Sequence, residues 1–209
     1  MTKASNFGDQ VQVYNGVDTT VRARFGKGGL LTGGVSVGRT VSDTCFKIDS
    51  PQAVRPGFCH ITPPWSAATQ YKVAGVYPLP WDTQVAATFQ NLPGVPITSS
   101  YVATNAEIAP SLGRNLAACP TAAGPCTATA IVDLIPANTV FEDRLTQLDL
   151  RFNKIIRFGR TRVQGMVDIY NVFNSNGITG INTRYGSAWL VPAQVMGGRL
   201  FKLGAQLDF

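Results

Sequence analysis

Apolar and polar residues alternate along several stretches of the chain, which is the period-two pattern of strands with two different faces. In the C-terminal stretch, Phe201, Leu203, Ala205, Leu207 and Phe209 share one face, with mostly polar residues between them. The same alternation predicts seven strands, at residues 11–25, 29–41, 68–79, 82–98, 143–158, 160–173 and 194–209. No stretch of helical period competes with them, so the sequence predicts an all-β fold.

Short and long connections alternate between these predicted strands. Three connections have only a few residues, near 26–28, 79–81 and 159. The other three are long, at about 42–67, 99–142 and 174–193. Bacterial outer-membrane barrels have tight turns at the periplasmic end and long loops outside. The pattern therefore predicts an antiparallel meander of seven to eight transmembrane strands, with residues 127–133 adding a short hairpin arm above the membrane.

The composition agrees with a folded chain that meets lipid through strands. Hydrophobic residues make up 44% and charged residues 14%, which is not the signature of disorder. No run of about 18 apolar residues occurs, so a membrane-spanning helix is not expected. The net charge of +6 comes from basic residues spread over many segments, so nucleic acid is not an expected partner.

The four cysteines all lie in long connections, with Cys45 and Cys59 in the first and Cys119 and Cys126 in the second. Three pairings are possible, and two local bridges would close loops without crossing the barrel wall. No CxxC motif occurs and His60 is the only histidine, so structural disulfides are expected and a metal site is not. Disulfides fit an oxidising surface.

Two motif-like features resemble catalytic arrangements but are better explained as structural. Residues 34–38 match GxSxG, but no helix is expected to follow Ser36. Asp149 and Asp168 would face the lumen on adjacent strands, where Arg151 and Arg162 would satisfy them. We therefore predict no catalytic residue, no cofactor and no enzyme activity.

Five passages in a fixed order carry a resemblance to a known family. They are YNGV through RF with GGVS (14–17, 24–25, 33–36), VYPLPW (76–81), LDLRFNK (148–154), VDIYNVFN (167–174) and RLFKLGAQLDF (199–209). The chain resembles the C-terminal barrel strands of TonB-dependent outer-membrane receptors. The similarity is greatest to the Oar-like type, which carries an N-terminal carboxypeptidase-regulatory-like domain.

This resemblance implies a location in the bacterial cell outer membrane and a place in a larger barrel of 22 strands with an N-terminal plug. It implies uptake of a scarce ligand, such as a siderophore or a carbohydrate, energised through TonB. The implied partners are outer-membrane lipid, the remaining barrel and plug, TonB through an N-terminal part, and the barrel assembly machinery through the C-terminal strand. Residues 1–10 would then begin a fragment within an extracellular loop, and 11–209 would be barrel strands.

Ligand contacts are expected from loop aromatics, namely Trp65, Tyr101 and Trp189, for which anchoring at the membrane interface is the alternative interpretation. A second function class stays open at this point. The chain could be a self-standing small outer-membrane barrel with a structural or adhesive role, using residues 99–106 as an eighth strand.

Overall fold

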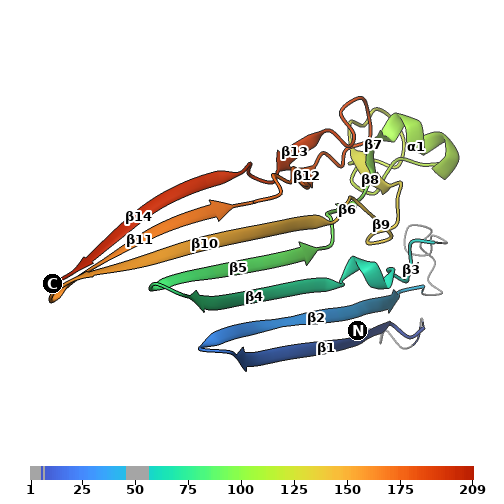
Figure 1. Cartoon of the computed structure of the whole chain (residues 1–209). Helices are drawn as coiled ribbons and strands as arrows, with labels where there is room; N and C mark the ends of the chain where they lie inside the picture. The colour runs from blue at the N-terminus through green and yellow to red at the C-terminus, as the bar shows by residue number, and fades with distance from the viewer. Residues whose placement is uncertain (1–5, 7, 46–56) are drawn as a thin grey trace.

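Seven long strands form one antiparallel meander in the computed structural model, which describes residues 6, 8–45 and 57–209 (Figure 1). They are β1 (Val11–Phe25), β2 (Gly29–Asp43), β4 (Gln70–Leu79), β5 (Thr83–Leu92), β10 (Leu145–Phe158), β11 (Thr161–Tyr170) and β14 (Leu200–Asp208). Each pairs with the next in that order, and β3 (His60–Ile61) extends the sheet beside the end of β2. The all-β prediction and the seven predicted strands are confirmed.

The strands predicted at 82–98 and 194–209 differ most from the structure, in which both are shorter. The fourth long strand, β5, ends at Leu92, because Pro93 cannot donate to the ladder and Gly94 lies against another backbone segment. A Cβ on Gly94 would lie 2.1 Å from the carbonyl oxygen of Glu142. The last strand begins at Leu200 rather than near residue 194, where the chain forms a separate short strand.

Three tight turns join the long strands at one end of the sheet. Phe25 pairs with Gly29 and Phe158 pairs with Thr161, so these turns hold three and two residues. Gly159 has a φ of 62°, in the left-handed region that glycine adopts without a steric penalty. In the third turn, Trp81 and Asp82 have φ values of 60° and 55°.

The short elements gather at the opposite end of the sheet (Figure 1). They are the 3-10 turn η2 (Trp65–Ala67), helix α1 (Asn105–Leu112) and strands β6 (Pro96–Ile97), β7 (Ser100–Thr104), β8 (Thr129–Asp133), β9 (Val140–Phe141), β12 (Ile178–Ile181) and β13 (Pro192–Val195). They pair as β6 with β9, β7 with β8, and β12 with β13. A strand does form within 127–133, but its partner is β7, far back in the sequence, rather than a local hairpin arm.

The register assigns every side chain of the meander to one of two faces, because cross-strand partners point to the same side. One row crosses all seven long strands through Ala23, Leu31, Gly75, Ala87, Leu150, Ile169 and Phe201. We call its side of the sheet the apolar face. The adjacent row on the other side, the polar face, runs through Arg24, Leu30, Val76, Ala86, Arg151, Asp168 and Lys202.

Charged residues of the long strands are divided unequally between these faces. The apolar face carries Arg39, Asp43 and Lys154. The polar face carries Asp18, Arg22, Arg24, Lys72, Asp149, Arg151, Arg157, Arg162, Asp168, Lys202 and Asp208. The alternation seen in the sequence is therefore preserved across the whole sheet.

The apolar face of the sheet is not buried as it would be in a soluble domain. Among the described residues, the buried hydrophobic side chains are Cys59, Ala103 and Leu116, none of which belongs to the seven long strands. Leu203 on the apolar face is 79% exposed, whereas Asp168 on the polar face is 4% exposed. Large apolar side chains normally lie inside a soluble domain. The meander thus has no hydrophobic core of its own.

Two expectations fall wholly or partly outside the described residues, namely the assignment of residues 1–10 and the middle of the 42–67 loop. The described helices include none that is long and apolar enough to cross a membrane. The meander is open within the described chain, since β1 and β14 each pair with a single neighbour.

Candidate functional site

A ladder of amide and carboxylate side chains crosses the polar face from β5 to the end of β11. Gln90 Nε2 donates to Gln147 Oε1 at 2.9 Å, and Gln147 Nε2 donates to both oxygens of Asp149 at 2.9 and 3.0 Å. The backbone N–H of Asn171 donates to Asp149 Oδ1 at 2.8 Å. Asp149 is therefore held by neighbouring donors, as expected for a satisfied polar wall.

Asp168 is held separately by the arginine across the strand pair. Arg151 Nε lies 2.5 Å from Asp168 Oδ1, and its terminal nitrogen lies 2.9 Å from Oδ2. The Tyr170 hydroxyl adds a longer bond of 3.4 Å to Oδ2. This fork is the bidentate geometry that arginine forms with carboxylates. The two aspartates thus have separate partners, and Arg162 lies opposite Arg157 and Asp208 rather than in either group.

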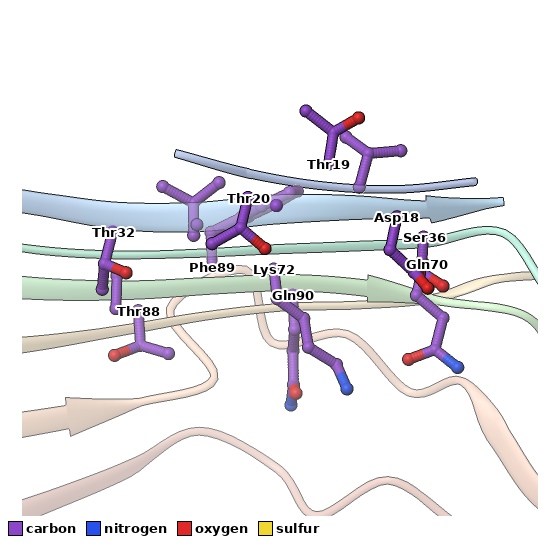
Figure 2. A pocket seen from close by; sticks show the side chains of 15 residues that line it. Asp18, Thr19, Thr20, Thr32, Ser36, Gln70, Lys72, Thr88, Phe89 and Gln90 are labelled. Carbon is purple, nitrogen blue, oxygen red and sulfur yellow. The ribbon is translucent and has the colours of Figure 1, made fainter. Parts of the chain in front are cut away.

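A hollow of about 430 Å³ lies over β1, β2, β4 and β5. Figure 2 shows Thr32, Thr88, Lys72 and Gln90 pointing to one side of the sheet and Thr19 to the other. Val35, Val73 and Phe89 line the same hollow from the apolar face, so its lining is mainly apolar, with hydroxyl, amide and ammonium groups on the polar side.

The backbones of the first three long strands approach closely beside this hollow, at two consecutive glycines. A Cβ on Gly34 would lie 2.4 Å from the carbonyl oxygen of Thr19, and one on Gly33 would lie 2.7 Å from that of Lys72. Larger residues would therefore push β2 away from its neighbours.

Ser36 of the GxSxG match lies in the middle of β2, with strand residues on both sides. Its cross-strand partners are Asp18 and Gln70. His60 pairs instead with Asp43, with 2.9 Å between Nδ1 and Oδ2. Since position 43 lies seven residues beyond position 36 along β2, the histidine lies roughly 23 Å along the sheet from the serine. The strand-to-helix turn of a nucleophile elbow is absent at this motif.

Two of the three predicted ligand contacts lie in one group of loops, which we call the loop cluster: β7, β8, α1 and residues 182–191. Tyr101 in β7 packs edge-on against Tyr185, with 6.1 Å between ring centroids. Half-buried Trp189 donates from Nε1 to the carbonyl oxygen of Thr98 at 3.0 Å. Trp65 lies elsewhere, in η2, with the guanidinium of Arg39 4.6 Å from its ring centroid. The three aromatics therefore do not form one site.

Glu107 ties Tyr101 to the start of α1. Its carboxylate accepts from the Tyr101 hydroxyl at 2.5 Å and from the backbone N–H and hydroxyl of Thr104 at 2.7 and 2.8 Å. The Thr104 hydroxyl in turn accepts from the Glu107 N–H, which completes a capping box. The hydrogen bond from Tyr101, followed by those from Thr104, lowers the pKa of Glu107, and the same carboxylate raises the pKa of Tyr101.

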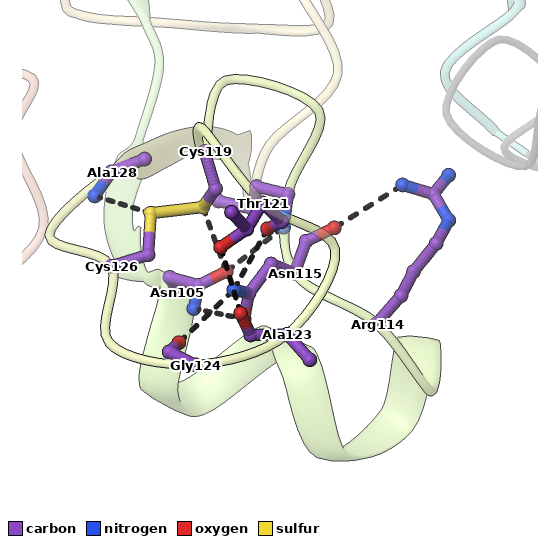
Figure 3. Close-up of a disulfide and its surroundings, with 10 residues drawn as sticks. Asn105, Arg114, Asn115, Cys119, Thr121, Ala123, Gly124, Cys126 and Ala128 are labelled. Atoms are coloured by element: carbon purple, nitrogen blue, oxygen red, sulfur yellow. Dashed lines mark hydrogen bonds between the residues drawn. A yellow bond between two sulfur atoms is a disulfide. The ribbon is translucent and has the colours of Figure 1, made fainter.

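The four cysteines form two bridges, Cys45–Cys59 and Cys119–Cys126, which are both local to one connection. Beside the second bridge, the buried amide of Asn105 donates to Asn115 Oδ1 at 2.9 Å (Figure 3). Asn115 Nδ2 donates to two loop carbonyls at 3.1 Å. The bridge and these amides give the α1 segment an ordered interior.

Sequence reasoning missed this interior and the capping box. The four-residue pattern Thr104-Asn105-Ala106-Glu107 is a recognised start signal for a helix and could have been found. The pairing of Asn105 with Asn115 has no comparable signal, because many exposed loops contain asparagine.

The described part of the chain contains no group of three or more His, Cys, Asp or Glu side chains arranged to hold a metal ion. The features that stand out are instead the ladder on the polar face, the hollow beside it and the loop cluster. Comparison of the chain with protein-family models, with curated proteins and with solved structures gave no match.

Proposed function

We propose that this chain is the C-terminal part of the barrel wall of a TonB-dependent outer-membrane receptor, which takes up a scarce ligand such as a siderophore or a carbohydrate. One observation carries the proposal, namely the side-chain distribution over the meander. A row of apolar, half-exposed to exposed side chains crosses all seven strands, and most charges of these strands, including the hydrogen-bonded Asp149, Arg151 and Asp168, occupy the other side. A barrel wall between lipid and a wet lumen requires this distribution.

The positions of the polar exceptions favour lipid over a second protein layer as the cover of the apolar face. Arg39 and Asp43 lie toward the loop end of β2, and Lys154 lies opposite Thr83 beside a tight turn. The Lys154 ammonium donates to the carbonyl oxygen of Trp81 within that turn. Charges that leave a central apolar band clear are typical of a membrane-spanning surface, where long basic side chains reach toward the interface.

Aromatic side chains at the turn end support the same orientation. Trp81 is 84% exposed, and Phe158 and Phe209 are also exposed. Aromatic residues are enriched at the membrane–water boundary. The tight turns would then lie in the periplasm, and the loop cluster would lie outside the cell, where a ligand arrives.

The open edges of the sheet support a larger barrel over a small one. Exposed edge strands pair readily with other strands, and a barrel removes them by closure. An eight-stranded barrel built from this chain would need residues 99–106 in its wall, but β7 pairs with β8 outside the meander. We therefore propose that further strands and a plug complete the wall, and that TonB acts on the plug.

A labelling experiment tests the proposed lipid contact. All four native cysteines are in disulfides, so an introduced cysteine is the single free thiol. The Leu203→Cys and Lys202→Cys variants would place the same fluorophore on opposite faces of β14. Brominated lipid should quench the label at position 203 several-fold more than at position 202. Equal quenching at both positions would contradict a lipid-facing wall.

An uptake experiment tests the proposed transport role. Cells with a disrupted gene for this protein should lose uptake of one ligand from a panel of siderophores, carbohydrates, peptides and cobalamin. Disruption of TonB in the same strain should abolish uptake of that ligand as well. Unchanged TonB-dependent uptake across the panel would reject the receptor role, whatever the labelling shows.

A further inference from the structure

We propose that Arg39, stacked on Trp65, is a binding site for the phosphate-bearing headgroup of an anionic lipid at the loop end of the apolar face. This inference rests on the proposed function, because it takes the apolar face to lie in lipid. It adds a defined ligand chemistry at a position that the uptake role does not require.

The strand register places Arg39 where the apolar band ends. Val37 pairs with Val17 on the apolar face, and two residues farther along β2, Arg39 pairs with Asn15 on that face. Two strand residues correspond to about 7 Å. A guanidinium about 7 Å beyond the last apolar residue of the band would lie outside the hydrocarbon, in the layer of lipid headgroups.

The guanidinium of Arg39 is held by Trp65, but within the described ranges it donates no hydrogen bond. Its Cζ lies 4.6 Å from the centroid of the Trp65 ring, a cation–π arrangement that fixes the plane of the group. No side chain or backbone group in the described ranges accepts a hydrogen bond from it. The neighbouring carboxylate, Asp43, is engaged by His60 Nδ1 and by the backbone N–H of Cys45, each at 2.9 Å. The N–H edge of Arg39 is therefore available to an external anion.

Arg144 holds Trp65 in place and so acts as a positioning residue. Its terminal nitrogens donate to the carbonyl oxygens of Ser66 and Thr69 at 3.1 and 2.6 Å, and its Nε donates to Asn91 Oδ1 at 2.6 Å. The Thr69 hydroxyl donates to the carbonyl oxygen of Trp65 at 2.8 Å. The η2 turn is thus fastened to the sheet, and the indole is presented to Arg39 before any ligand binds.

The chemistry of the site favours a phosphate ester of a lipid over a free ion. A planar guanidinium fork binds two phosphate oxygens at once, and arginine stacked on an aromatic ring loses little freedom on binding. Trp65 is 43% exposed and can lie against the glycerol or acyl part of the same lipid. A free phosphate ion would make the first contact without the second.

Trp65 itself can report binding. Because the chain has three tryptophans, the Trp81→Phe, Trp189→Phe double variant leaves Trp65 as the single tryptophan, which is excited selectively at wavelengths that tyrosine does not absorb. The full chain in neutral detergent would be titrated with phosphatidylglycerol, phosphatidylcholine or inorganic phosphate. Phosphatidylglycerol should give a saturable change in Trp65 emission, and equal concentrations of the other two should give little change.

Arg39→Gln in this background should weaken the apparent affinity for phosphatidylglycerol about tenfold or more. Arg160→Gln is the matched control, because it removes the same charge from a tight turn at the other end of the sheet and should leave the affinity unchanged. Arg39→Lys keeps the charge without the fork and should give an intermediate affinity. Circular dichroism would verify that each variant keeps its strand content.

The inference is overturned if Arg39→Gln binds phosphatidylglycerol as tightly as the unsubstituted background, or if phosphatidylcholine gives the same response. Saturation by inorganic phosphate alone would assign the site to a free anion and would also overturn it. Bromolipid quenching of the label on Leu203→Cys, measured separately in a bilayer, distinguishes this failure from that of the proposed function. Strong quenching at position 203 with no effect of Arg39→Gln would support the lipid-facing wall and reject the headgroup site.

Discussion

Arg151 and Asp168 form the best-defined charged pair on the polar face. Asp168 is almost inaccessible, so loss of Arg151 would leave a carboxylate without its main partner. Arg151→Gln should lower the melting temperature of the chain in detergent by roughly 2–4 °C. Arg22→Gln, which removes a charge from an exposed position of the same face, should change it by less than about 1 °C. Similar melting temperatures for the two variants would show that the fork is not stabilising.

Glu107 predicts a local pH dependence in the loop cluster. Its pKa is lowered in the folded chain by the Tyr101 hydroxyl and by Thr104. The stabilisation is therefore present above the pKa of the unfolded chain and is lost as the pH falls through the lower, folded value. The protection factors of residues 100–113, which correct for the intrinsic pH dependence of amide exchange, should fall as the pH drops below the ordinary glutamate pKa of about 4.3.

Two variants check the cause of that loss of protection. Glu107→Gln should exchange faster at neutral pH and should lose most of the acid dependence, because no charge is left to neutralise. Thr104→Ala removes the cap and should cost the helix about 1 kcal/mol while leaving the acid dependence through Tyr101 in place. An acid dependence that survives Glu107→Gln in full would assign it to another group.

Side-chain chemistry was only partly readable from the sequence. The placement of Asp149 and Asp168 on the same face of the sheet was predictable from alternation, because the position along a strand determines the face. The role of Arg144 did not follow, since its acceptors Ser66 and Thr69 lie 78 and 75 residues away and meet it only after the sheet forms. Arg162 was assigned to the wrong neighbours because register, not spacing, selected its partners.

At the scale of elements, the tight turn at Gly159 gives a clean test of backbone conformation. Gly159 has a φ of 62°, and a Cβ there would meet no atom within 4 Å. Gly159→Ala should therefore cost about 1 kcal/mol through backbone strain alone. Gly197 also has open space around it but is not in the left-handed region, so Gly197→Ala should be close to neutral. Chemical unfolding in detergent would compare the two.

The long strands were predictable because alternation over ten or more residues is a strong local signal. Their ends were less predictable where loop contacts decide them, as at Gly94 against Glu142. The short strands in the connections were mostly missed. β7 and β8 pair across 24 intervening residues, with a helix and a disulfide between them, and their length alone gives little periodicity.

At the scale of the whole molecule, an introduced charge should destabilise the sheet much more on the apolar face than on the polar face. Ala87 and Thr88 are consecutive residues of β5, on the apolar and the polar face respectively. In a lipid bilayer, Ala87→Arg should cost about 2–4 kcal/mol because its row lies in the middle of the apolar band. Thr88→Arg should change stability by less than about 0.5 kcal/mol. Equal losses of unfolding free energy for the two variants, measured by refolding into lipid vesicles, would show that the two faces do not lie in different environments.

Both disulfides join cysteines of a single connection, 14 and 7 residues apart, and neither links one strand hairpin to another. Oxidation therefore imposes no order on the pairing of the strands. The chain can be bridged while it is still extended, before any hairpin has formed, or afterwards, and it reaches the same topology. Mispaired intermediates that join the first connection to the second would be the oxidation products able to block assembly, so a thiol–disulfide isomerase would have only this kind of error to correct.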